Sequence, residues 1–314
     1  MSVRIINADV LDGLRSLADE SVHCVVTSPP YWGLRDYGAA GQIGLEPTLQ
    51  DHIAKLVEVF RDVRRVLRKD GTLWLNYGDA YASGGSKGSG GGDNKGNTGA
   101  FYSFSVKPSF SVKPKDLMLM PERLAIALCD DGWYIRSRII WAKPNPMPES
   151  VTDRPTKSHE HIWLMSKSPR YHYDAEAIQE IAIYAGQTVS FANDKKAARA
   201  NAKGNKPSGN EAPGAGKVAN GDFRNARDVW TIATSPFPEA HFATFPPELA
   251  ERCIKAGCPA GGTVLDPFGG SGTTGLVADR LHRSAILIEL NPTYAEMARK
   301  RVTNDCPLFM EATP

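Results

Sequence analysis

Hydrophobic and polar positions follow two different periods along the first third of the chain. Short apolar runs rich in β-branched and aromatic residues have the length of buried strands. They occupy residues 3–8, 22–27 and 72–77. Between the last two runs, apolar residues recur every three or four positions from Ile53 to Leu67, which predicts an amphipathic helix. Thr48 and Asp51 form a capping box at its start, and Gly71 is expected to end it.

This alternation of strands and helices favours a parallel sheet covered on both faces. The pattern resumes later in the chain with further apolar runs and amphipathic stretches. We predict strands at residues 133–141, 161–165, 263–266 and 285–290, and helices at 121–130, 247–256, 273–281 and from 292 onward. The last fifth of the chain thereby contains a complete βαβ-like unit of the kind that binds nucleotides.

Two polar tracts interrupt the pattern. Residues 83–99 consist mostly of Gly, Ser, Asn and Lys and contain too little apolar surface to offset the entropy of ordering them. We therefore expect a mobile surface loop there. Residues from about 185 to 225 also lack periodicity, and we expect them to become ordered only on a partner.

The composition is that of an ordinary globular protein. Of the 314 residues, 41% are hydrophobic and 23% charged, which excludes collagen-like, coiled-coil and wholly disordered classes. No apolar run approaches the roughly 18 residues that cross a bilayer, and no signal peptide is recognisable. We expect a cytoplasmic protein without membrane contact. The five cysteines include no C-x-x-C pair, so we expect reduced thiols, no disulfide framework and no metal site.

The net charge of +2 is too small to imply a polyanionic partner, but the charge is unevenly distributed. Residues 136–227 carry fifteen Lys and Arg against nine Asp and Glu. A basic middle third is a weak indication of nucleic-acid binding, and a solvated loop region explains the same charges.

A candidate cofactor site begins at Val264. The sequence V-L-D-P-F-G-G-S-G-T-T-G comprises a strand, a glycine-rich turn and the start of a helix. The next strand ends at Glu289, whose carboxylate is placed to accept both hydroxyls of a ribose. Gly270, Gly272 and Gly275 also satisfy the G-x-G-x-x-G pattern of NAD-binding folds. The carboxylate of Asp266 favours the ammonium group of S-adenosyl-L-methionine and would oppose a pyrophosphate.

A second motif, Thr27-Ser-Pro-Pro-Tyr31, stands at the carboxyl end of the strand over 22–27, where open α/β sheets bind ligands. The Ser28 hydroxyl and the Pro29 carbonyl are placed to accept hydrogen bonds from the exocyclic amine of an extruded base, and Tyr31 to stack on it. The structural alternative is a proline-rich turn. A given pentapeptide arises by chance in such a chain with a probability of about 10⁻⁴.

At these residues the chain resembles the β-class, or permuted, amino-methyltransferases of DNA, in which the catalytic motif precedes the cofactor motif. Residues 28–31 match the family's (S/D/N)PP(Y/F/W), and residues 266–272 match its D-P-F-x-G-S-G. The resemblance implies the α/β, Rossmann-like fold of S-adenosylmethionine-dependent methyltransferases. Its sheet is mostly parallel, circularly permuted and seven-stranded, with a smaller target-recognition region. It also implies S-adenosyl-L-methionine as the cofactor.

The resemblance further suggests three regions. Residues 1–174 would form the catalytic half of the core, including the loop at 83–99. Residues 175–227 would form a partly disordered insertion that recognises the DNA target. Residues 228–314 would form the half that binds S-adenosylmethionine.

Site residues follow from the resemblance by position. Ser28, Pro29, Pro30 and Tyr31 are the catalytic candidates. The cofactor-binding candidates are Asp9, Thr244, Phe245, Pro246, Asp266, Pro267, Phe268, Gly269, Gly270, Ser271, Gly272 and Glu289. Residues 244–246 and 268–270, with Asp266, are expected to contact the methionine part, Glu289 the ribose and Asp9 the adenine edge.

Four residues have a structural interpretation beside the functional one. Asp9 suits the cap of a helix over residues 11–17 equally well. Lys143 is either a surface charge or a contact to a phosphate or the donor, and Trp32 either packs in the core or lines the base pocket. His241 is expected to form only structural hydrogen bonds.

The target base is predicted to be cytosine, methylated at N4. Methylation of the cytosine ring carbon needs an attacking thiolate, usually after a proline, and no Pro-Cys dipeptide occurs. In the family, Ser in this motif is associated mainly with cytosine N4, and Asp or Asn mainly with adenine N6. N6-adenine methylation is therefore the alternative within the family. Outside the family, the alternatives are a nicotinamide-dependent oxidoreductase and a nucleic-acid-binding module without catalysis.

The expected partners are double-stranded DNA and S-adenosylmethionine, together with a cognate restriction endonuclease and a second copy in a homodimer. Basic residues of the middle third are candidate DNA contacts. They are Arg154, Lys157, Lys195, Lys196, Arg199, Lys203, Lys206, Arg224 and Arg227.

Overall fold

A computed structural model of the chain shows two compact units, Met1–Asp174 with Arg227–Pro314, and Ala175–Ala226. The structure describes residues 2–34, 36, 38–39, 41–82, 113–182, 188–189, 218–219, 223–235 and 245–305. The loop predicted at 83–99, most of the polar tract at 185–225, His241 and Thr244 lie outside the described residues.

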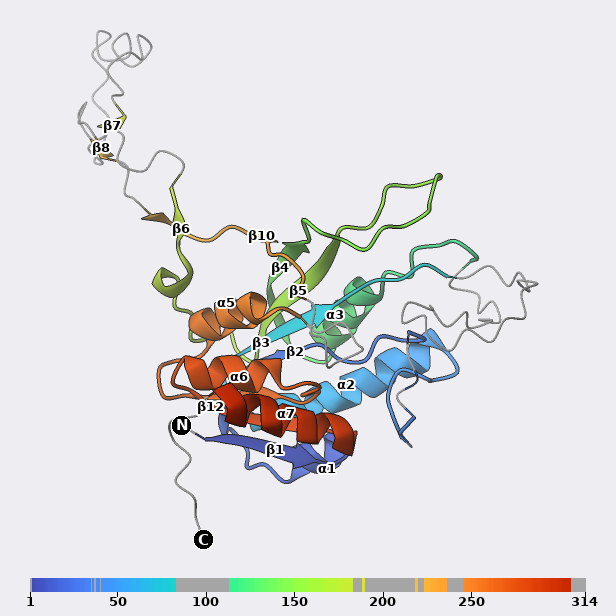
Figure 1. Ribbon diagram of the computed structural model, residues 1–314, viewed down its shortest axis with the longest axis horizontal. Helices are drawn as coiled ribbons and strands as arrows, with labels where there is room; N and C mark the ends of the chain where they lie inside the picture. The colour runs from blue at the N-terminus through green and yellow to red at the C-terminus, as the bar shows by residue number, and fades with distance from the viewer. Residues whose placement is uncertain are drawn as a thin grey trace. The chain divides into compact units, whose positions relative to one another are not determined.

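The first unit is built on a sheet with the strand order β1-β12-β11-β2-β3-β5-β4-β10 (Figure 1). Its strands are β1 (Val3–Asn7), β2 (Val22–Thr27), β3 (Leu67–Tyr77), β4 (Tyr134–Ala142), β5 (His159–Ser166), β10 (Val229–Thr231), β11 (Thr263–Asp266) and β12 (Ser284–Glu289). Only β5 runs antiparallel to its neighbours in this described sheet. The predicted mostly parallel, permuted α/β fold is thus confirmed.

The predicted number of seven strands is wrong, because the described residues form eight. The additional strand is β10, which adds in parallel to the edge of β4. Trp230 on this strand is 2% exposed and stacks on Trp74 of β3, with 6.1 Å between ring centroids. Burial of one large aromatic ring therefore holds a strand of three residues, which is too short for a periodicity signal.

Helices cover both faces of the sheet, as predicted. On one face α1 (Val10–Arg15), α2 (Leu49–Val66) and α3 (Met120–Asp130) lie in sequence, each contacting the next. On the other lie α5 (Pro247–Gly257), α6 (Thr273–Arg280) and α7 (Pro292–Asp305) (Figure 1). Leu56, Phe60 and Val63 of the predicted stripe on α2 are fully buried in the core.

Helix α2 begins where the capping box predicts and ends earlier than expected. The Thr48 hydroxyl accepts a hydrogen bond from Asp51 N at 3.1 Å. The helix stops at Val66, and Leu67 already belongs to β3, so Gly71 does not end it. Gly71 instead lies inside the strand, where a Cβ would come within 2.5 Å of the Leu67 side chain and 2.9 Å of His23 O. Close packing against β2 requires glycine there.

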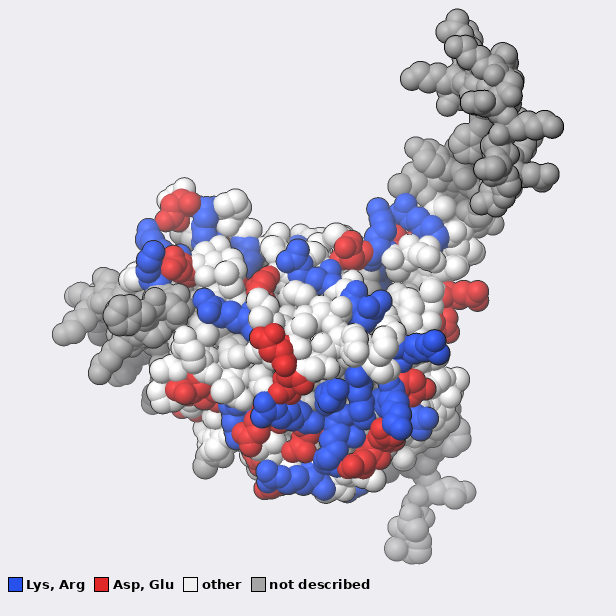
Figure 2. Space-filling view, turned by 180° about the vertical axis from the view of Figure 1, so that it is seen from behind, with Lys and Arg blue, Asp and Glu red and all other residues white. Residues whose placement is uncertain are grey.

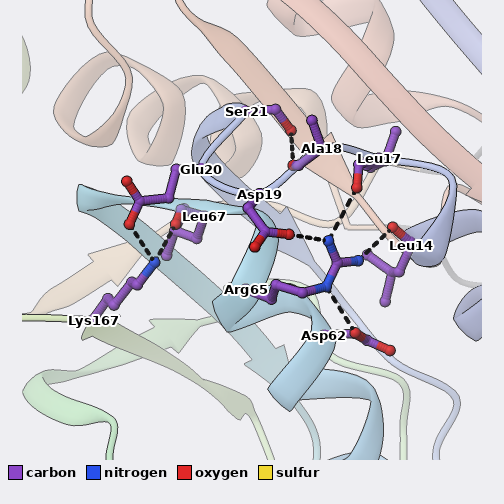
Figure 3. Close-up of polar contacts among 10 residues, drawn as sticks. All are labelled: Leu14, Leu17, Ala18, Asp19, Glu20, Ser21, Asp62, Arg65, Leu67 and Lys167. Atoms are coloured by element: carbon purple, nitrogen blue, oxygen red, sulfur yellow. Dashed lines mark hydrogen bonds and ion pairs between the residues drawn. The ribbon is translucent and has the colours of Figure 1, made fainter.

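An arginine on the last turn of α2 fixes the connection between α1 and β2 (Figure 3). The Arg65 guanidinium donates to the carbonyls of Leu14 at 2.9 Å and Leu17 at 3.0 Å, and contacts Asp19 at 2.6 Å and Asp62 at 3.1 Å. Beside it, Lys167 donates to Leu67 O and contacts Glu20. The Ser21 hydroxyl donates to Ala18 O. This group of contacts sets where β2 enters the sheet.

The second unit contains a 3₁₀ turn, η1 (Glu176–Ile178), and two short antiparallel ladders. These pair β6 (Glu180–Ile181) with β9 (Phe223–Arg224), and β7 (Thr188–Val189) with β8 (Val218–Ala219). Within it, Arg224 contacts Glu180 at 3.3 Å.

Surface charges of both signs are interspersed over the face seen in Figure 2. Among the helices of the described residues, none combines the length and apolar character needed to traverse a bilayer.

Candidate active site

The two sequence motifs meet at the carboxyl edge of the sheet. Strands β2 and β11 are parallel neighbours, with Val264 opposite Cys24 and Leu265 opposite Val25. Their last residues therefore lie side by side, and the Thr27 hydroxyl donates to Asp266 Oδ1 at 2.7 Å. Because Ser28 follows Thr27 directly, this bond joins the start of the proline motif to the start of the glycine-rich turn.

Asp266 is held by three neutral donors. Oδ1 also accepts from Phe268 N at 3.1 Å, and Oδ2 accepts from the Thr274 hydroxyl at 2.7 Å. The side chain is 2% exposed, and burial raises its pKa to about 6 although the three hydrogen bonds lower it. The carboxylate is thus charged at neutral pH, while no donor in this set carries a positive charge to balance it.

The glycine-rich turn leads from Asp266 to the second carboxylate, Glu289. Gly270 N donates to Glu289 Oε2 and Asn291 N donates to Oε1, both at 2.8 Å. Burial raises the pKa of Glu289, and these backbone hydrogen bonds oppose the shift. Glu289 keeps partial exposure at the end of β12, so its oxygens remain able to accept further donors.

Glycines of this turn serve two different purposes. A Cβ on Gly269 would lie 2.9 Å from Leu287 Cβ, and one on Gly272 would lie 2.8 Å from Ala298 Cβ, so both positions are required by packing. Gly270 has a φ of +50° and faces open space, since a Cβ there would meet only Phe268 O at 3.9 Å. The turn therefore leaves room for a ligand at Gly270.

An arginine from the last helix ties down the rest of the turn. Arg301 donates to the Ser271 hydroxyl at 3.0 Å and to the Thr273 hydroxyl at 2.9 Å. Ser271 and Gly272 are buried, and Gly272 immediately precedes α6 with a left-handed φ of +81°. Sequence reasoning did not identify Arg301, because no local signal links residue 301 to residue 271.

The proline motif emerges from β2 with alternating burial. Pro29 is buried, whereas Ser28, Pro30 and Tyr31 are half-buried. The Tyr31 ring packs edge-to-face on Tyr77, with 5.0 Å between centroids, and its hydroxyl donates to Glu160 Oε2 at 3.0 Å. Burial and the neighbouring Glu160 carboxylate raise the pKa of Tyr31. The phenol is thus held neutral in one orientation, and its stacking on a base stays a prediction.

Glu160 is the centre of a polar cluster that the sequence did not reveal. It forms an ion pair with Lys143 and accepts from Asn76 at 3.1 Å, in addition to Tyr31. Burial alone would raise the pKa of Glu160, but Lys143 holds it below its usual range. Lys143 also lies 4.3 Å from the centroid of the Trp141 ring. Lys143 is therefore not a surface charge but part of a largely buried ion pair, and its contact with a phosphate or the donor stays a prediction.

A second polar chain positions the residue after the motif. Trp32 packs against the core, and its indole N–H donates to Glu46 O at 2.9 Å. The Glu46 carboxylate contacts His52 Nδ1 at 2.8 Å, and His52 Nε2 contacts the Tyr77 hydroxyl at 2.8 Å. His52 is a fully buried polar residue on the core-facing side of α2, and these two contacts satisfy both nitrogens of its ring.

The remaining candidates lie around this edge. Asp9 caps α1 by accepting from Leu11 N at 2.9 Å, which confirms its structural interpretation; its contact with adenine is untested. Asn7, two residues earlier, pairs with Glu289 across β1 and β12. Phe245 is half-buried, and Pro246 is buried immediately before α5.

Comparison with known proteins decides the family. A family model described as "DNA methylase" matches residues 22–300. The chain belongs to the DNA methylase family. The family predicted from the two motifs is therefore confirmed, and membership does not favour the nicotinamide-dependent oxidoreductase.

Two relatives of this DNA methylase match it over almost its whole length. Type II methyltransferase M.SmaI of Serratia marcescens is 47% identical over 301 residues, covering 96% of this chain and 91% of the relative. Type II methyltransferase M.Cfr9I of Citrobacter freundii is 45% identical, covering 96% and 88%.

Solved structures share the fold of this DNA methylase. The PvuII DNA methyltransferase (cytosine-N4-specific) has a TM-score of 0.64 at 21% identity, covering 100% of this chain and 89% of that one. The M1.HpyAVI–SAM complex has a TM-score of 0.53 at 19% identity, covering 96% and 98%.

Proposed function

We propose that this DNA methylase transfers a methyl group from S-adenosyl-L-methionine to the exocyclic N4 of cytosine, at a specific sequence in double-stranded DNA. The observation that carries the proposal is the Thr27–Asp266 hydrogen bond, which places the proline motif beside the cofactor turn. The choice of cytosine rests on Ser28 as the first residue of that motif.

The residues present suit the methyl donor. Open space at Gly270 admits a ligand, and Glu289 is partly exposed to accept ribose hydroxyls. Asp266 supplies a buried negative charge whose three hydrogen-bond donors are neutral, which favours the ammonium of the methionine part. When bound, S-adenosyl-L-methionine supplies an electrophilic methyl group.

The proline motif activates the target amine by accepting its hydrogen bonds. Two consecutive prolines fix the backbone, so the Pro29 carbonyl and the Ser28 hydroxyl are held in place before the base arrives. Two accepted hydrogen bonds draw the amine lone pair out of conjugation with the ring. Tyr31, fixed through Glu160, supplies an aromatic wall for the extruded base.

The three regions have separate tasks in this proposal. Residues 1–174 supply the catalytic motif, residues 228–314 the donor site and residues 175–227 the recognition of the target sequence. A cytoplasmic location stays a prediction that is consistent with the bacterial relatives. A cognate restriction endonuclease and a homodimer stay predictions that follow from the family resemblance.

The test is methyl transfer to duplex DNA with labelled donor, followed by identification of the modified nucleoside by mass spectrometry. N4-methylcytosine is the expected product, and N6-methyladenine alone would overturn the assignment of the base. Ser28→Ala is expected to lower kcat at least about a hundredfold, as removal of one positioned catalytic group commonly does. Donor binding, measured by calorimetry, should stay unchanged. Full turnover by this variant would refute the role of Ser28.

A further inference from the structure

The connection between β4 and β5 is a long loop that projects beyond the ends of both strands (Figure 1). Its base is closed by a hydrogen bond from Lys143 N to Ser158 O at 2.8 Å. Further along, the Glu149 carboxylate accepts from Arg154 at 2.7 Å and from Lys157 N at 3.4 Å. The loop is thus braced at its base and along its returning arm.

The outgoing arm of the loop is stiff for covalent reasons. Pro144, Pro146 and Pro148 fix φ at every second position. Asn145 and Met147 each precede a proline, which restricts them to extended conformations. Asn145 is also held by a residue outside the loop, because its Oδ1 accepts from Thr234 N at 2.9 Å. The arm therefore presents its side chains in a fixed arrangement.

Met147, on this arm, is highly exposed to solvent. Its side chain is 77% exposed, the largest exposed fraction of any large hydrophobic side chain in the described part of the chain. On a flexible loop such a side chain could fold back onto the surface. The prolines on both sides restrict the backbone of Met147, and the apolar group remains in water at a cost in solvation that contact with a partner would relieve.

The loop rises from the same edge as the catalytic motif. Strand β4 runs parallel to β2 and β3, and its end continues directly into Lys143. Lys143 pairs with Glu160, which in turn accepts the Tyr31 hydroxyl. From Lys143 to Met147 an extended chain reaches at most about 14 Å. Met147 is therefore tethered within about 14 Å of Lys143, whose partner Glu160 accepts from the Tyr31 hydroxyl.

We propose that Met147 is an apolar wedge that enters the DNA duplex beside the target base and occupies the space left by its extrusion. This inference rests on the proposed function. Apolar side chains of this kind enter base steps in proteins that unstack DNA. Extrusion leaves stacked faces exposed, and a preorganised methionine covers them at little further entropic cost.

The test compares wild type, Met147→Ala and Met147→Leu on two duplex oligonucleotides that carry the recognition site mapped by methylation sequencing. In one duplex the target cytosine is paired with guanine, and in the other it faces adenine. Met147→Ala should lower kcat/KM about tenfold or more on the paired duplex and less than about threefold on the mismatched one, because an unpaired base is already easier to extrude. Met147→Leu should retain wild-type activity on both.

A fluorescent cytosine analogue at the target position should report less extrusion by Met147→Ala. Ile126→Ala, which removes another exposed apolar side chain at 61% exposure on α3, is the matched control and should change neither duplex. Equal losses on both duplexes, or full activity of Met147→Ala on the paired one, would overturn the wedge alone. So would a change of oligomeric state in sedimentation, which would assign Met147 to a protein interface. A wild-type chain that methylates neither duplex would overturn the proposed function and the wedge together.

Discussion

At the scale of single residues, the carboxylate of Asp266 is the point where chain-distant motifs converge. It accepts from Thr27 on one side and from Thr274 and Phe268 on the other. Burial raises its pKa to about 6 although these three hydrogen bonds lower it, and no donor among them carries a positive charge. A cation that binds beside this carboxylate therefore gains more than it would at an exposed acid.

This arrangement predicts a pH-dependent affinity for the donor. Below about pH 6 the Asp266 carboxyl becomes protonated, so binding of S-adenosyl-L-methionine should weaken as the pH falls from 7.5 to 5.5. Asp266→Asn should bind weakly and lose this pH dependence. Titration calorimetry across the range measures it, with Asp12→Asn, at a side chain 71% exposed, as the control. A wild-type affinity independent of pH would contradict the role of the charge.

The same raised pKa affects folding in the opposite sense. The folded state binds this proton more tightly than the unfolded chain does, because the folded pKa lies above the ordinary 3.8. The contribution of Asp266 to the free energy of unfolding therefore decreases as the pH rises from about 4 to about 6. In the absence of a cationic ligand, Asp266 therefore contributes less to the stability of the folded state at neutral pH than at acidic pH.

At the scale of elements, Arg65 is the contact that holds α2 to the turn before β2. Arg65→Lys keeps the charge but loses the planar fork that reaches both Leu14 O and Leu17 O. We expect the free energy of unfolding to fall by about 1–3 kcal/mol, since partly buried carbonyls lose charged donors. Urea unfolding of the purified protein measures this.

Arg61→Lys is the matched control for that prediction. Arg61 lies on the same helix with a side chain 66% exposed and pairs with Asp131. Exposed ion pairs contribute little to stability, so this substitution should leave the urea midpoint almost unchanged. Equal shifts for the two variants would show that the carbonyl contacts of Arg65 contribute nothing particular.

At the scale of the whole molecule, the second unit offers a test of target recognition. The residues of the first unit that flank the second unit in the sequence are held by backbone hydrogen bonds. Asp174 N donates to Ala256 O, and Asp228 O accepts from Ile140 N. Replacing residues 175–226 by a flexible Gly/Ser linker should preserve donor binding within about twofold, because the donor site lies elsewhere. Site-specific methylation should be lost. Methylation sequencing measures this, and an unchanged target sequence would exclude the unit from recognition.

Much of the fold could be predicted from periodicity alone. Strands β2 and β11 were predicted with their observed bounds, because each is an apolar run that ends at a sharp change of residue type. The end of α2 was not, since Leu67 suits both the helical stripe and the following buried strand. Strand β10 was missed because Trp230 forms its contact with Trp74, a residue far away in the sequence.

The candidate site divides in the same way. Its motif residues could be found because prolines, glycines and an acid at strand ends have local signatures. The residues that hold them, Arg301, Glu160 and His52, could not, because each acts through a partner distant in sequence. A single sequence gives no information on such pairs, so the supporting contacts became visible only with the fold.

The bond between Thr27 and Asp266 spans 239 positions of the chain. A ribosome that adds about 5–20 residues per second needs roughly 10–50 s to pass from one partner to the other. Throughout that interval the nascent polypeptide carries its proline motif without the neighbouring acid. Newly made molecules should therefore be inert toward DNA until Asp266 has been added, and translation products that stop before Asp266 should be inert permanently.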